Sequence, residues 1–187
     1  MATIAQQNAI SAYLQGRHIP AGLGTKEEAC SIAAINLALT GELTDTIPAC
    51  MSEVIGQWII VVQDAMPDDM RNSQQWRELL PLAAGTGRAK EKERLDIIFA
   101  WMWDAVLPLL QTIADSNCFG VEWKTMCAEK TQAAAEAAWA AEAARAARAA
   151  EAAWAAGAAR AAAEAAWDKF NPVDLLQRLV EVNNGHD

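Results

Sequence analysis

Residues 133–166 read AAAEAAWAAEAARAARAAEAAWAAGAARAAAEAA, and this stretch decides the fold class. Twenty-four of its 34 residues are alanine, the residue with the highest helix propensity, because its side chain loses no rotamer freedom on ordering. The stretch therefore predicts a long α-helix. No convincing alternation of apolar and polar residues indicates a strand elsewhere, so we expect an all-α fold.

The residues that interrupt the alanines recur at every third position from Glu136 to Arg160. A helix turns once every 3.6 residues, so these positions form no coiled-coil seam. Two interpretations are open: a low-complexity helix whose alanines dock on a neighbouring element, or a docking arm anchored by tryptophans. Because large aromatic side chains need burial, Trp139, Trp154 and Trp167 are candidate partner-binding residues.

The remainder of the chain is predicted to be helical, with breaks at proline and glycine. We expect a helical domain at residues 1–120, a long alanine-rich helix at 121–170 and a closing helix with a tail at 171–187. Asn171-Pro172 suits the start of that closing helix. Within the first domain, a nearly all-apolar helix that Gly41 ends should be central and buried.

Several helix boundaries follow from local signals. Thr25-Lys-Glu-Glu28 has the pattern of a capping box and predicts a helix start. A further helix is expected to begin near Pro48 and to stop at Pro67, and Pro81 is expected to end a short one. Pro108 should kink or loosen the long helix that begins near Arg94.

Composition limits the function classes. The 187 residues carry a formal net charge of −9 and no basic segment, which argues against nucleic-acid binding. Apolar runs such as residues 58–62 are far shorter than the ~20 residues that span a bilayer, and no basic then apolar leader opens the chain. We therefore expect no membrane association and a cytoplasmic protein whose widely spaced cysteines are free thiols.

No catalytic motif, metal-ligand spacing or cofactor signature is recognisable, so we expect a non-enzymatic protein without a metal or cofactor. The turn Gly85-Thr86-Gly87-Arg88 precedes a helix and offers the alternative of a small anionic ligand, such as a nucleotide, held by helix-start amides. A plain turn is the simpler reading. On the following helix, Ile97 and Trp101 project away from the main apolar stripe and are further candidate partner contacts.

Two segments carry a resemblance. AAWAAEAARAARAAEAAW resembles the variable-copy Ala/Trp/Arg repeats of many uncharacterised bacterial and bacteriophage proteins, and residues 27–67 are similar to the helical domain that precedes such repeats. The resemblance brings no established activity and no site residue. It implies a phage or mobile-element setting, in which small non-enzymatic inhibitors of host defence are common.

These observations predict a protein–protein interaction module, with a phage-type inhibitor of a host defence system as its most specific form. The acidic balance and the tryptophan-bearing helix favour a protein partner over nucleic acid. Alanine faces permit close helix approach, so we also expect a homo-oligomer.

Overall fold

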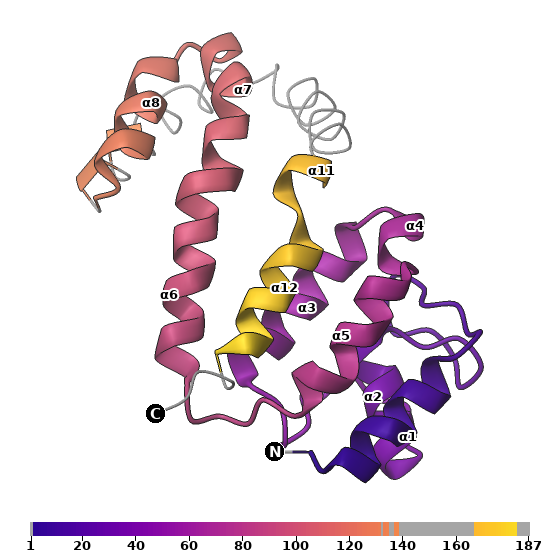
Figure 1. The fold of residues 1–187 in the computed structure, drawn as a ribbon. Helices are drawn as coiled ribbons and strands as arrows, with labels where there is room; N and C mark the ends of the chain where they lie inside the picture. The colour runs from indigo at the N-terminus through magenta and orange to yellow at the C-terminus, as the bar shows by residue number, and fades with distance from the viewer. Residues whose placement is uncertain (1, 132, 135–136, 139–166, 183–187) are drawn as a thin grey trace. The chain divides into compact units, whose positions relative to one another are not determined.

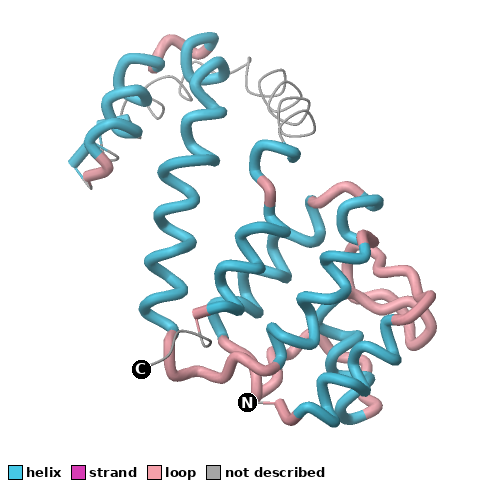
Figure 2. The backbone as a smooth tube through the Cα atoms, viewed as in Figure 1, coloured by secondary structure: helices cyan, strands magenta, loops and turns pink. Residues whose placement is uncertain are grey.

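The computed structural model describes residues 2–131, 133–134, 137–138 and 167–182 (Figure 1). These residues form helices joined by loops, and none of them lies in a strand (Figure 2). The all-α prediction is thereby confirmed. The chain divides into two compact units, unit 1 with residues 1–98 and 172–187 and unit 2 with residues 99–171.

Unit 1 contains the N-terminal helices together with the C-terminal one. Its helices are α1 (Ile4–Leu14), α2 (Ser31–Thr40), α3 (Glu53–Ala65), α4 (Asp68–Arg71), α5 (Gln74–Ala84), the first part of α6 (Glu91–Trp101) and α12 (Pro172–Glu181). Unit 2 holds the last residues of α6, the π-helical turn η1 (Met102–Val106), the 3₁₀ turn η2 (Leu107–Leu110), α7 (Gln111–Ser116), α8 (Gly120–Glu129) and α11 (Trp167–Phe170).

The core of unit 1 is centred on α2, which contacts α1, α3 and α5. Residues 31–36 of this helix are all buried, as expected for a helix that is apolar on nearly every side. Gly41 ends α2 in the left-handed conformation, with φ +76°, and its N–H donates to Leu37 O, so the predicted stop is confirmed. The completely buried Trp76 donates its indole N–H to Ser31 Oγ at 3.0 Å, which ties α5 to the start of α2.

The C-terminal helix α12 belongs to this same core. It contacts α5 and α3, and its apolar face is buried at Val173, Leu175, Leu176, Leu179 and Val180. The helix begins at Pro172, as predicted. The predicted division places its boundaries at residues 120 and 170, whereas the compact units meet at residues 98/99 and 171/172. α12 joins the N-terminal helices because its apolar face packs into their core, although it lies far from them in the sequence.

Two predicted helix boundaries are wrong. Thr25 does not open α2: its Oγ1 accepts from the N–H groups of Glu27 and Glu28 and closes a turn within a loop. The helix begins six residues later at Ser31, where the Cys30 sulfur accepts from Ala33 N. The helix expected to begin near Pro48 is α3, and it begins at Glu53. Ser52 caps this helix, because its hydroxyl accepts from Ile55 N.

Pro81 does not end its helix. It lies inside α5, which continues to Ala84. A proline removes one N–H donor from the helix, and the residues beyond it, Ala83 and Ala84, are completely buried. Burial of the last turn therefore outweighs the local signal of the proline.

In unit 2, Pro108 loosens the helix as predicted, since the π-helical turn η1 and the 3₁₀ turn η2 replace regular α geometry around it. The helix expected from residue 121 to 169 is interrupted early. α8 ends at Glu129, and Lys130 adopts the left-handed conformation with φ +53°. Beyond that break, Ala134 and Ala138 are buried against Met126. The repeat residues 139–166 lie outside the described residues.

We predict that Leu176→Ala lowers the free energy of unfolding of unit 1 by about 2–5 kcal/mol, because Leu176 is completely buried and its truncation leaves a cavity. Urea unfolding of the full chain measures this loss. The matched control is Arg178→Ala, which removes an exposed side chain from the same helix. Equal effects of the two substitutions would contradict the placement of α12 in this core.

Candidate functional site

The backbone N–H groups of the Gly85–Arg88 turn are largely engaged within the protein. Gly85 N donates to Leu82 O at 2.9 Å, and Thr86 N to Ala83 O at 3.2 Å. Gly87, with φ +60°, donates its N–H to Cys50 O at 2.9 Å. The buried Thr86 hydroxyl accepts from Ser52 N and donates to Ala83 O. The amides of Gly85 and Thr86 are therefore engaged at the end of α5, and that of Gly87 holds the turn against the loop before α3.

An anion does occupy a helix N-terminus here, and it is the carboxylate of Glu91. Its oxygens accept from Ser52 Oγ at 2.5 Å, Glu53 N at 2.8 Å and Val54 N at 3.3 Å. These donors are the N-cap hydroxyl and the first amides of α3. A carboxylate at this position satisfies unpaired N–H groups and interacts favourably with the positive end of the helix dipole.

Arg94 completes this arrangement from one turn further along α6. Its guanidinium is completely buried and donates to Gly87 O and Thr86 O, each at 3.1 Å. Glu91 Oε2 lies 3.9 Å from Arg94 Nη1. Burial lowers the pKa of Arg94, while the charges of Glu91 and Glu93 act in the opposite direction. We name Ser52, Thr86, Glu91 and Arg94 the α3 latch.

Arg88, the expected anion-binding side chain, pairs instead with Glu53 at 2.9 Å. Both side chains are about half exposed, so this surface pair contributes roughly 0–1 kcal/mol. Each of the four residues predicted to bind an anion, Gly85, Thr86, Gly87 and Arg88, thus forms a hydrogen bond or an ion pair within the protein.

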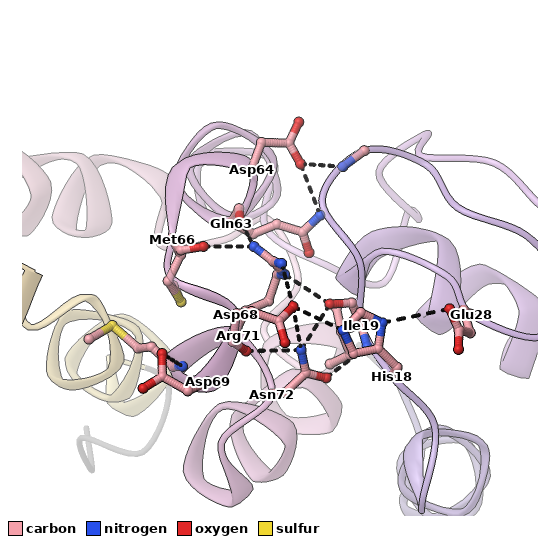
Figure 3. A network of polar contacts seen from close by, with 12 residues as sticks. His18, Ile19, Glu28, Gln63, Asp64, Met66, Asp68, Asp69, Arg71 and Asn72 are labelled. Carbon is pink, nitrogen blue, oxygen red and sulfur yellow. Dashed lines mark hydrogen bonds and ion pairs between the residues drawn. The ribbon is translucent and has the colours of Figure 1, made fainter. Parts of the chain in front are cut away.

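The second polar cluster lies around His18 (Figure 3). His18 Nε2 lies 2.9 Å from Asp68 Oδ1, and its Nδ1 lies 3.7 Å from Glu28 Oε2. The imidazole therefore stands between carboxylates of the loop before α2 and the first turn of α4. Sequence reasoning missed this cluster, because its members are far apart in the chain and form no motif.

Arg71, from the same short helix as Asp68, and its C-cap residue Asn72 also hold the loop that carries His18 and Ile19 (Figure 3). The buried guanidinium of Arg71 donates to Ile19 O, Gln63 O, Met66 O and Asp68 Oδ1, over distances of 2.7–3.0 Å. Asn72 Oδ1 accepts from Ile19 N at 2.8 Å. Nearly all of these partners are backbone groups, so the cluster fastens the loop at residues 17–22 to α3 and α4.

The chemistry of this cluster is structural. The hydrogen bond from His18 is the main cause that lowers the pKa of Asp68, and Arg71 acts in the same direction. Among the described residues, the ring nitrogens of His18 lie close to the carboxylates of Asp68 and Glu28 and not to a nucleophilic side chain. Over that same part of the chain, no group of three or more His, Cys, Asp or Glu side chains could hold a metal ion.

The residues predicted to bind a partner have different locations. Trp139 and Trp154 lie outside the described residues. Trp167 and Trp101 are both half-buried in unit 2: Trp167 packs edge-on against Phe170 at 5.7 Å between ring centroids, and Trp101 Nε1 donates to Phe170 O at 2.7 Å. Ile97 is half-buried in α6.

The exposed apolar side chains of α6 include Leu95 and Phe99, which the helical spacing places on the main apolar stripe, opposite Ile97 and Trp101. Leu95 is 40% exposed and Phe99 47%, more than either Ile97 or Trp101. The packing of α11 against η1 explains the reversal for Trp101. Spacing alone identifies an apolar stripe but not which face a neighbouring helix covers.

One helical segment of the described chain, Glu91–Ser116, is long and apolar enough by length and composition to cross a membrane. Only 6% of its most apolar 18-residue window is buried. Asp104 and Pro108 interrupt the apolar run of this segment, so the sequence does not predict a membrane span there. Length and composition do not by themselves establish insertion, since helices of soluble proteins can share them.

The widely spaced cysteines predict buried free thiols, and all four are free, but only Cys30 is buried: Cys50 and Cys127 are half-buried and Cys118 is exposed. Burial raises the pKa of Cys30 and of Cys127, so neither thiol is activated as a nucleophile. Comparisons with protein-family models, curated proteins and solved structures found no match.

We predict that Glu91→Gln destabilises unit 1 by about 0.5–2 kcal/mol, because the amide loses the charge that caps α3. Equilibrium unfolding in urea measures the change. Glu93→Gln is the control: Glu93 is exposed and lies 3.9 Å from Lys90, so its loss should change stability by less than about 0.5 kcal/mol. If both variants behave alike, the α3 latch does not depend on this carboxylate.

The lowered pKa of Asp68 predicts a pH-dependent contribution to stability. A carboxylate whose folded-state pKa is depressed stabilises the fold above its ordinary pKa of about 3.9, and this contribution is lost as the pH falls through the lower folded value. Asp68→Asn should therefore lower the thermal midpoint at pH 7, and its difference from the unmodified chain should shrink below pH 4.

Melting curves between pH 7 and pH 3 test this prediction. Asp69→Asn is the control, because Asp69 accepts only from the adjacent Met70 N. A difference for Asp68→Asn that stays constant over the whole range would mean that the carboxylate charge plays no part.

Proposed function

We propose that the chain is a non-catalytic protein–protein interaction module that docks through the apolar helical segment Glu91–Ser116. The observation that carries this proposal is the mismatch between the composition of this segment and its burial. Its residues are apolar around most of the circumference, yet its most apolar stretch is 6% buried. A helix that is apolar all round requires an apolar environment.

The polar residues of the segment favour a protein partner over lipid. Asp104 lies near the middle of the segment and forms an ion pair with Lys130. An aspartate at the centre of a membrane-spanning helix costs about 2.5–3.5 kcal/mol on insertion scales. Lys92 and Asp96 form a further pair on the exposed side of α6. A protein surface accommodates apolar side chains interleaved with such pairs, as interface rims do.

The kind of partner and the oligomeric state are proposed from the sequence. A host defence component as partner follows from the resemblance to bacteriophage proteins, and a homo-oligomer follows from the alanine-rich repeat. Capture of a small anion at Gly85–Arg88 is the weaker proposal, because the amides of Gly85, Thr86 and Gly87 already have partners within the chain.

We predict that benzoylphenylalanine at position 99 cross-links to protein when the full chain is irradiated in producing cells and in purified form. Phe99 is 47% exposed, so the probe reaches the docking face with little cost to stability. The control carries the same probe at Lys92, whose side chain is 84% exposed on the same helix. Denaturing gels and mass spectrometry measure the adducts.

A discrete protein adduct at position 99 that is weak or absent at position 92 supports the proposal, and an adduct between two copies supports self-association. Lipid adducts at position 99 would overturn it in favour of a membrane-associated segment. Equal, diffuse labelling at both positions would also overturn it, because the apolar face would then have no specific partner.

A further inference from the structure

Regular α geometry is lost between Met102 and Leu110, in the turns η1 and η2. Leu107 N donates to Met102 O, five residues earlier, and Gln111 N donates to Pro108 O, three residues earlier. Pro108 has no N–H to give to Asp104 O. The backbone of η2 therefore bonds in the i→i+3 pattern of a 3₁₀-helix instead of the i→i+4 pattern of an α-helix.

α8 supplies polar contacts to this irregular segment. Trp123 Nε1 donates to Leu107 O at 2.9 Å. Lys130, at the end of α8, pairs with Asp104, and Gln111 Nε2 donates to Gly120 O at 2.9 Å. Trp123 and Lys130, the C-cap residue of α8, therefore bond to the irregular segment itself, and Gly120 accepts from Gln111, the first residue after it.

The same helix covers apolar side chains of the segment. Trp103 and Leu107 pack against a cluster made by Met126, Ala134 and Ala138. Phe119, just before α8, stacks edge-on with Trp123 at 6.0 Å between ring centroids. Removal of α8 would take Met126 away from Trp103 and Leu107 and would remove the Trp123 donor from Leu107 O.

Two residues close to the ends of α8 have a left-handed backbone conformation. Cys118 lies two residues before the helix with φ +57°, and Lys130 follows it with φ +53°. Left-handed conformations are unfavourable for non-glycine residues. The contacts of α8 must therefore offset this cost, and a helix of ten residues has little intrinsic stability of its own.

We propose that α8 is a releasable strap: docked, it holds Met102–Leu110 in the irregular form and covers Trp103 and Leu107; released, it loosens that segment and exposes them. Use of the exposed side chains by a partner rests on the proposed function. The strap itself does not, and the experiment below contains no partner, so the two proposals fail separately.

Hydrogen–deuterium exchange of the full chain, followed by mass spectrometry of peptides, tests the strap. Trp123→Phe keeps an aromatic ring but removes the donor to Leu107 O, and Lys130→Met removes the pair with Asp104. In the double variant, we expect amide exchange in peptides from 102–110 to be at least about tenfold faster, together with exchange in 120–129, because local opening governs exchange. Peptides from α2 and α3 should be unchanged.

Lys124→Met is the matched control, because Lys124 is exposed on α8. It should leave exchange at 102–110 unchanged. If exchange rises in 120–129 but not in 102–110, or in neither, Pro108 alone sets the irregular form and the proposal is overturned. Faster exchange throughout the chain, α2 and α3 included, also overturns it, since α8 would then be an inseparable part of the fold. Trp123→Phe alone repeats the test at lower cost to stability.

Discussion

The carboxylate of Glu91 at the N-terminus of α3 is the interaction on which the arrangement of the second half of unit 1 depends. Glu91 joins the first turn of α6 to the start of α3, and Arg94, one turn further along α6, joins the glycine turn at residues 85–88 to the same group. Arg94 balances its charge and satisfies two carbonyls of the turn. Because these groups are buried or half-buried, loss of one partner leaves another unsatisfied, which costs more than a surface pair contributes.

The α3 latch also shows that the Gly85–Arg88 motif predicts an anion at a helix N-terminus, but at the N-terminus of the wrong helix. Glycines before a helix, followed by bases and acids, predict an anion at a helix start. The structure has such an anion, but it belongs to the chain, and the helix that it caps lies some forty residues earlier. Sequence spacing cannot show this pairing, since Ser52 and Glu91 meet only after α3, α5 and the turn have folded.

The parts of the fold that sequence predicts well are those fixed by local physics. The all-α class follows from helix propensity, the burial of α2 from its apolar circumference, its end from Gly41 and the irregular turns from Pro108. The misplaced boundaries are those where tertiary packing decides. Thr25 has the residue types of a helix cap, but its hydroxyl closes a loop that Arg71 and Asn72 hold in place. Pro81 remains within a helix because the turn beyond it is buried. The His18 cluster had no sequence signal, since fifty residues separate His18 from Asp68.

The placement of α12 in the same unit as α1 to α5 makes unit 2 an insertion within the sequence of unit 1. The core around Leu176 is completed only after the entire insertion has been synthesised. Most of unit 1 is therefore synthesised before α12, the last helix of this unit. The length of the insertion has only a small effect on the entropic cost of closing unit 1. Loop-closure entropy grows only with the logarithm of loop length, and a doubling costs about 0.6 kcal/mol. In the unfolded chain, the entropic cost of bringing Ile98 and Pro172 together therefore depends only weakly on the number of residues between them.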